Sequence, residues 1–253
     1  MLANSVRYYL IGSTAIAMEL LKEDRKLPRS TKDIDFAIMV ASHEDYNRLM
    51  EELCENGFTQ SDNPWTLYHD KYNTVIDILA FGEIVQNHTL SFKERNIDFH
   101  MLGFDEVLKQ PQQVLIEEVI VNIPALPGMI LLKLVSWNDR PEQRQKDLSD
   151  IITIIKSFFD IATLAEKHSD LFENEPYNEN YISAEALGLE GAKYLAESTK
   201  LTETIKNILV TNTDSVTTST IAHHWAKGRD NPELDECFEI LLRLKRGLFT
   251  NKT

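Results

Sequence analysis

Residues 33–40 read Asp-Ile-Asp-Phe-Ala-Ile-Met-Val, an apolar run with two carboxylates at its start. Short apolar stretches of this kind are typical of strands. Residues two apart in a strand project to the same face. We therefore expect Asp33 and Asp35 to stand side by side, while Ile34 and Phe36 face the core.

Strand and helix patterns alternate on both sides of this stretch. The expected strands cover residues 8–11, 34–40 and 74–81, and helical spacing covers residues 13–23 and 44–56. A short helix up to Lys109 and a strand near residues 119–123 follow. This alternation predicts an α/β (α+β) fold for the first part of the chain.

A third carboxylate interrupts a later strand, where Asp77 lies within Val-Ile-Asp-Ile-Leu. If that strand neighbours the first, three carboxylates converge, and two unit charges about 4 Å apart repel by roughly 4 kcal/mol at an effective dielectric constant of about 20. Magnesium prefers oxygen ligands, and two such ions can clamp a phosphoryl displacement. We therefore expect two Mg²⁺ ions, with Mn²⁺ as a substitute, on Asp33, Asp35 and Asp77. The alternative is that Asp77 is a salt-bridged or edge residue.

Gly12 and Ser13 stand where the first strand turns into a helix. Glycine lets a phosphate approach the backbone, and the serine hydroxyl and the free N–H groups of the first turn can hold it. We expect these two residues to bind the β and γ phosphates of a nucleotide. No Gly-Lys-Ser/Thr follows, so the pattern is not a Walker loop. An ordinary turn and helix cap is the alternative.

The second half of the chain is helical in pattern. A long helical stretch, residues 127–159, contains Pro141, which we expect to begin a second helix at its first position. Amphipathic spacing recurs at residues 184–197, 201–209 and 234–248. We expect two domains, residues 1–125 and residues 126–253, the second of them helical.

Composition narrows the possible functions. The chain has 253 residues, 43% of them hydrophobic, and a formal net charge of −14. This acidity disfavours general adhesion to nucleic acid or to anionic membranes. Cys54 and Cys237 make neither a disulfide framework nor a zinc site. No apolar run is long enough for a membrane helix, and we expect a cytoplasmic protein without a signal peptide.

The order of the motifs resembles the DNA polymerase beta-like nucleotidyltransferase superfamily. Residues 29–35, Arg-Ser-Thr-Lys-Asp-Ile-Asp, are similar to the form found in the AbiEii-like branch of abortive-infection and type IV toxin-antitoxin toxins. A second block is similar to that branch's Lys, Arg and Lys-Asp-x-x-Asp signature, and its residues are Lys133, Arg140, Lys146, Asp147 and Asp150. The resemblance covers roughly residues 7–158.

The resemblance implies a nucleotidyltransferase-type mixed sheet flanked by helices, followed by a helical region whose first two helices contribute to the nucleotide site. It implies transfer of an NMP from an NTP to an acceptor hydroxyl. The catalytic and metal-binding residues would be Asp33, Asp35 and Asp77. The nucleotide-binding residues would be Gly12, Ser13, Arg29, Thr31, Lys133, Arg140, Lys146 and Asp147. Asp147 and Asp150 share a helical face, so they could instead orient Lys133 and Arg140.

The sequence leaves several alternatives for the acceptor and the partners of the protein. The branch suggests a toxin that acts on tRNA, with a cognate antitoxin as partner. Modification of a protein or a small molecule is an alternative within the same chemistry. A nucleotide-binding or partner-binding module without turnover is the alternative from another class.

Overall fold

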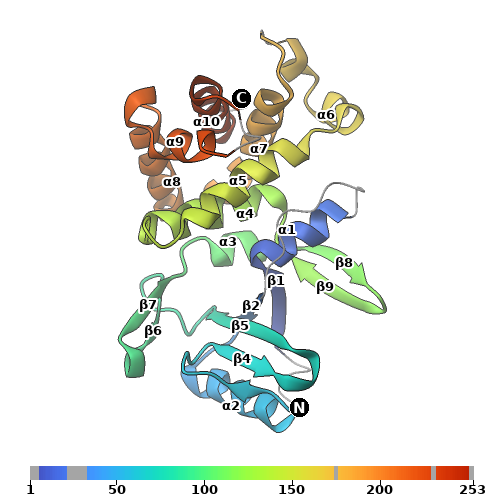
Figure 1. The fold of residues 1–253 in the computed structure, drawn as a ribbon, viewed down its shortest axis with the longest axis vertical. Helices are drawn as coiled ribbons and strands as arrows, with labels where there is room; N and C mark the ends of the chain where they lie inside the picture. The colour runs from blue at the N-terminus through green and yellow to red at the C-terminus, as the bar shows by residue number, and fades with distance from the viewer. Residues whose placement is uncertain (1–5, 22–32, 174–175, 229–231, 251–253) are drawn as a thin grey trace. The chain divides into compact units, whose positions relative to one another are not determined.

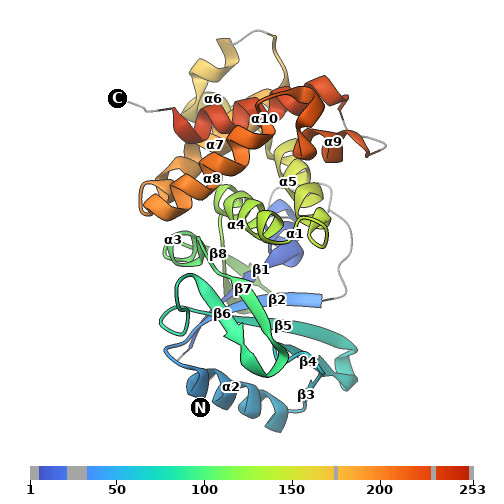
Figure 2. The same cartoon turned by 90° about the vertical axis from the view of Figure 1, so that its left-hand side faces the viewer.

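The computed structural model describes residues 6–21, 33–173, 176–228 and 232–250 (Figure 1 and Figure 2). The chain divides into two compact units, Met1–Ala125 and Leu126–Thr253. Arg29 and Thr31, which the sequence predicts to bind nucleotide, lie outside the described residues.

The described part of the first unit is built on a five-stranded sheet of order β1-β2-β5-β4-β3. Its strands are β1 (Arg7–Ile11), β2 (Asp33–Met39), β3 (Thr59–Gln60), β4 (Thr66–His69) and β5 (Thr74–Phe81). Neighbours β2 and β5 are parallel, whereas the other pairs are antiparallel. The predicted mixed α/β fold is therefore confirmed.

Two helices lie on opposite faces of this sheet, α1 (Gly12–Leu21) and α2 (His43–Glu55) (Figure 1). The Ser42 side chain caps α2 by accepting from the Asp45 amide at 3.1 Å. Tyr46 is buried, and its hydroxyl donates to the Ile78 carbonyl at 3.0 Å. This bond attaches α2 to β5 one residue beyond Asp77.

The remaining elements of the first unit are short. They are the hairpin β6 (Thr89–Phe92) and β7 (Ile97–His100), the helix α3 (Phe104–Leu108), and the hairpin β8 (Gln112–Ile116) and β9 (Val119–Ile123). Trp65 contacts Phe92 and Phe99 with ring centroids 5.3 and 4.8 Å away. These aromatic contacts attach the β6–β7 hairpin to the segment that precedes β4.

The second unit is helical, as the sequence predicts. Its helices are α4 (Leu126–Asp139), α5 (Gln145–Phe158), α6 (Ile161–Lys167), α7 (Glu179–Leu195), α8 (Thr199–Asn212), α9 (Thr220–Ala226) and α10 (Leu234–Phe249). The expectation for Pro141 is wrong, because α5 begins only at Gln145. The Arg140 carbonyl accepts from the amides of Gln143 and Arg144 at 3.0 Å each, so Pro141 lies in a separate turn.

Helices α7 and α10 touch through their backbones. A Cβ atom added to Gly188 would lie 2.5 Å from the Leu244 carbonyl oxygen and 2.9 Å from the Cα atom of Gly247. Both distances are shorter than real Cβ contacts. Glycine at position 188 therefore sets how closely the two helices approach.

Replacing Gly188 by alanine is expected to lower the free energy of unfolding by about 1–3 kcal/mol, because the new methyl group overpacks rigid backbone. Gly191→Ala, one turn along α7, is the matched control. Its Cβ would meet the Cδ2 atom of Leu248 at 3.1 Å, a flexible group that can move. Urea unfolding of both variants measures the difference, and equal stabilities would show that the helices can separate without cost.

In the part of the chain that the structure describes, no helix combines the length and the apolar character that crossing a membrane requires.

Candidate active site

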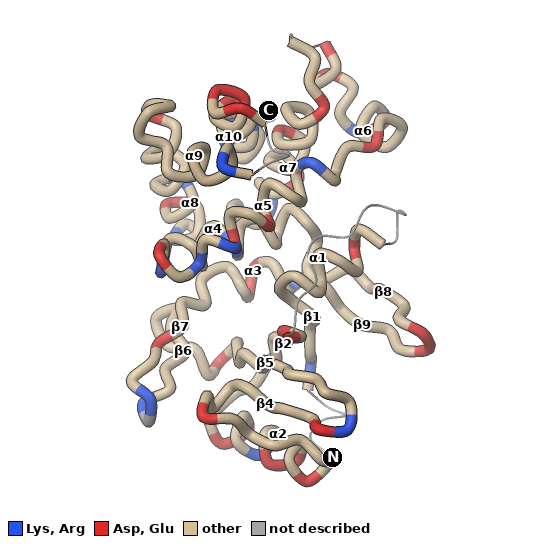
Figure 3. The backbone as a smooth tube through the Cα atoms, in the orientation of Figure 1, with Lys and Arg blue, Asp and Glu red and all other residues tan. Residues whose placement is uncertain are grey.

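Three carboxylates meet on neighbouring strands of the first unit. Asp35 on β2 is paired in register with Asp77 on β5, and Asp33 lies two positions before Asp35 on the same face. One carboxylate oxygen from each residue lies within 4.8 Å of the others, and all three residues are partly buried. Figure 3 marks acidic residues on β2, next to β5. The carboxylate triad, Asp33, Asp35 and Asp77, is the densest group of potential metal ligands among the described residues.

The surroundings of Asp77 disfavour the negatively charged form of its carboxyl group. Burial raises the pKa of Asp77, and the charge of Asp33 raises it further. The hydroxyl of Thr66 opposes both effects by donating a hydrogen bond to Oδ1 of Asp77 at 2.5 Å. The ionised triad is therefore costly unless a cation shares it.

Asp77→Asn is expected to raise the free energy of unfolding of the metal-free protein by about 0.5–2 kcal/mol at neutral pH, because it removes one charge from the triad. The raised pKa means that the folded protein favours the protonated carboxyl. The wild type should therefore be less stable than Asp77→Asn at neutral pH, and this difference should decrease as the pH falls and Asp77 becomes protonated.

Thermal unfolding in EDTA between pH 4 and pH 8 checks this prediction. Asp62→Asn, in an exposed loop of the same unit, is the control for losing one negative charge. A destabilised Asp77→Asn variant at neutral pH would show that the carboxylate is fully compensated by the protein alone.

Gly12 lies against this triad. It has a φ of +67°, and a Cβ atom there would lie 2.9 Å from Cγ of Asp35. Both the positive φ and the close approach demand glycine. The preceding residue, Ile11, pairs with Asp35 across β1 and β2, which places the start of α1 beside the carboxylates. The structure thus brings Gly12 next to Asp35, and phosphate binding by Gly12 and Ser13 stays a prediction.

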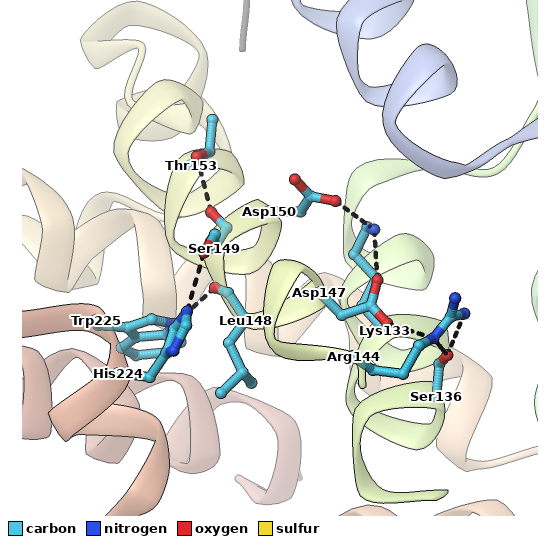
Figure 4. Close-up of polar contacts among 10 residues, drawn as sticks. All are labelled: Lys133, Ser136, Arg144, Asp147, Leu148, Ser149, Asp150, Thr153, His224 and Trp225. Atoms are coloured by element: carbon cyan, nitrogen blue, oxygen red, sulfur yellow. Dashed lines mark hydrogen bonds and ion pairs between the residues drawn. The ribbon is translucent and has the colours of Figure 1, made fainter. Parts of the chain in front are cut away.

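Three residues of the second block, Lys133, Asp147 and Asp150, form a buried ion cluster in the other unit (Figure 4). Lys133 on α4 is 8% exposed, and its Nζ atom donates to Asp147 at 3.0 Å and to Asp150 at 2.6 Å. Both acids come from one face of α5. Arg144 adds a second cation, with Nε 3.1 Å from Oδ2 of Asp147 and 2.8 Å from Oγ of Ser136.

The other two basic residues of this block lie outside the cluster. The Nε atom of Arg140 is 3.4 Å from Oδ2 of Asp139, and Lys146 is exposed on the first turn of α5. Asp147 and Asp150 therefore contact Lys133 but Arg140 pairs with a different acid. The contacts to Lys133 agree with the sequence hypothesis that these acids orient it.

The contact of Thr66 with the triad could not be predicted from the sequence. Thr66 and Asp77 are direct partners across the antiparallel strands β4 and β5. The residues around Thr66 carry no motif, and only the register of the hairpin reveals its position. Its hydroxyl contacts the triad directly, and no spacing rule predicts that contact.

Comparison with known proteins identifies the family. The family model for the nucleotidyl transferase AbiEii toxin, Type IV TA system, matches residues 5–204. A crystal structure of an antigenic nucleotidyltransferase-like protein from Paracoccidioides brasiliensis is similar at 16% identity and a TM-score of 0.39, covering 81% of this chain and 86% of that one. A search of curated proteins gives no match.

The protein is a nucleotidyltransferase. It belongs to the AbiEii family of nucleotidyltransferase toxins of type IV toxin-antitoxin systems, because that family model covers most of the chain. The family resemblance seen in the sequence is thereby confirmed. The matched residues end within α8, so α9 and α10 lie beyond them.

Proposed function

We propose that this nucleotidyltransferase transfers an NMP from an NTP to an acceptor hydroxyl in a metal-dependent reaction. The acceptor oxygen forms a bond to the α-phosphorus, the bond from that phosphorus to the bridging oxygen of the β-phosphate breaks, and pyrophosphate leaves. The hydroxyl proton passes to a base. The observation that carries the proposal is the carboxylate triad within 4.8 Å beside Gly12.

The donor set of the triad suits Mg²⁺ or Mn²⁺. It consists of three carboxylates and offers neither sulfur nor imidazole, and oxygen ligands are those that hard cations prefer. Its residues are partly exposed, so substrate oxygens and water can complete the coordination. Two bound ions would supply charge neutralisation of the triphosphate and of the reacting oxygens.

The chain's own groups would position the substrates. Asp33 and Asp35 would hold the cations, and Asp77 would complete the site nearest the acceptor hydroxyl and would accept its proton. Gly12 and Ser13 hold the β and γ phosphates through the first turn of α1. The expected contributions of Arg29, Thr31, Arg140 and Lys146 are contacts to the nucleotide. Catalysis on this scheme is positioning and charge neutralisation.

Lys133 would bind the nucleotide while two carboxylates hold its ammonium group in place. Lysine has three N–H donors, and the bonds to Asp147 and Asp150 use two of them. The two carboxylates hold the ammonium in one place. The remaining donor is the one that we assign to a substrate phosphate.

We propose tRNA as the acceptor and the cytoplasm as the place of action, with a cognate antitoxin as the protein partner. The AbiEii membership supports the antitoxin and the NTP. The acceptor follows from the motif resemblance.

The test is incubation of the protein with each α-labelled NTP and Mg²⁺ in the presence of bulk cellular RNA and protein. Label in the tRNA band, lost on addition of EDTA, is the expected result. Transfer to RNA should weaken steeply with added salt, because phosphate contacts release counterions. Label in protein or in a small molecule would reject tRNA as the acceptor, and label nowhere would reject the activity.

A further inference from the structure

We propose that Thr66 is a positioning residue for the third carboxylate of the triad. Its hydroxyl holds one oxygen of Asp77, which fixes the side chain so that the second oxygen faces the cation and the acceptor hydroxyl. The inference rests on the proposed metal-dependent transfer and adds a residue that no motif of the sequence contains.

The strand register places the two side chains together. Thr66 on β4 pairs with Asp77 on β5, and directly opposite residues of antiparallel strands project to the same face. The Oγ1 atom of Thr66 donates to Oδ1 of Asp77 at 2.5 Å in a partly buried environment. A hydrogen bond to an ionised acceptor in such a place is short and stronger than a neutral one.

The backbone on the Thr66 side is fixed by local hydrogen bonds. The Thr66 amide donates to the Asn63 carbonyl at 3.0 Å, and the Thr66 carbonyl accepts from the Ser61 amide at 3.0 Å. The next ladder bond runs from the Ile78 amide to the Trp65 carbonyl at 2.8 Å. The hydroxyl of Thr66 is therefore carried by a rigid turn, and its position is defined to within the freedom of one torsion angle.

The strand that carries Asp77 is fixed from its other face as well. The buried Tyr46 of α2 donates its hydroxyl to the Ile78 carbonyl at 3.0 Å. With both backbones held, the rotation of the Asp77 side chain is the main freedom left. The terminal torsion angle of aspartate is broad, and repulsion by the neighbouring carboxylates, whose oxygens lie within 4.8 Å, favours turning away. The bond from Thr66 opposes that rotation.

Three substitutions separate this role from simple packing. Thr66→Val keeps the β-branched shape and removes the hydroxyl, Thr66→Ala removes both without overpacking, and Thr66→Ser restores the donor. The matched control is Thr74→Val on β5, whose hydroxyl donates to the Tyr72 carbonyl at 3.0 Å in an exposed position. All four substitutions are compared with the wild type.

The readouts are Mn²⁺ binding by electron paramagnetic resonance without nucleotide, and kcat and KM for transfer. Loss of the donor in Thr66→Val and Thr66→Ala is expected to weaken Mn²⁺ binding and to lower kcat by about 10–100-fold, as for other groups that orient metal ligands. The KM for NTP should change by less than about threefold. Thr66→Ser and Thr74→Val should stay within about threefold of the wild type.

Wild-type Mn²⁺ affinity and kcat in a folded Thr66→Val or Thr66→Ala protein would overturn the inference while leaving the proposed function intact. Failure of Thr66→Ser to restore either quantity would overturn it too, because the hydroxyl would then not be the active group. A wild-type protein that neither binds Mn²⁺ nor transfers nucleotide would overturn the proposed function itself.

Discussion

Replacing Asp35 by asparagine is expected to lower the rate of nucleotide transfer by about 1000-fold or more. Asp35 lies between Asp33 on its own strand and Asp77 across the sheet, so its charge is the centre of the triad. A cation contributes several kcal/mol of transition-state stabilisation, and each 1.36 kcal/mol corresponds to a tenfold change in rate. Initial rates with labelled NTP measure the loss.

The control experiment for the Asp35→Asn variant tests whether the protein still folds. Asparagine is nearly isosteric, and one negative charge fewer should leave the thermal unfolding temperature in EDTA equal or higher. Circular dichroism should match the wild type. A variant that retains transfer within about tenfold of the wild-type rate would refute the assignment of the triad as the metal site.

Lys133→Met is expected to lower the free energy of unfolding by about 3–5 kcal/mol, the typical cost of removing one partner from a buried ion pair. The Lys133 and Asp150 side chains are 10% and 6% exposed, so water cannot replace the missing ammonium. Asp147 and Asp150 would be left as buried carboxylates without that cation. Urea unfolding measures the change.

Two further variants test the cause. Lys200→Met, on an exposed turn of α8, should change stability by less than about 0.5 kcal/mol. Adding Asp147→Asn and Asp150→Asn to Lys133→Met should recover stability, because the stranded charges are removed. A Lys133→Met protein as stable as the wild type would show that the cluster is not electrostatically coupled.

The central strands and the acidic triad could be predicted from the sequence. Apolar runs gave residues 34–40 and 74–81, against β2 at Asp33–Met39 and β5 at Thr74–Phe81. The period-two rule placed Asp33 and Asp35 on one face. Adjacency of the two strands was a hypothesis, and the parallel pairing of β2 with β5 bears it out.

The strand expected near residues 119–123 is β9 (Val119–Ile123), but its hairpin partner β8 and the strands β3, β4, β6 and β7 were not predicted. The β3 and β4 strands have two and four residues and carry no alternation, and β8 begins with two glutamines. Such strands form because a neighbouring strand supplies the hydrogen bonds, so their own residues carry little signal. The role of Thr66 could not be predicted for the same reason, because it depends on a strand register that the local sequence does not encode.

Ile34 and Phe36 are less buried than the apolar pattern of the strand predicts. Both are only partly buried, although the pattern predicted a core-facing side. Phe36 instead contacts the ring of Tyr8 on β1, with centroids 6.4 Å apart. Full burial begins further along β2, at Ala37 and Ile38. The end of β2 that carries the carboxylates is therefore the open end of the strand.

The glycine contact between α7 and α10 predicts how a C-terminal truncation would affect the protein. A polypeptide that stops at residue 204, where the family match ends, would lose the helix that fills the notch at Gly188. The surface of α7 at Gly188 fits only a closely packed backbone, so neither water nor an unrelated C-terminal extension would replace the contact with α10. We expect such a shortened product to be recovered as aggregate, because it also lacks the buried side chains of Ile205, Leu209 and Trp225.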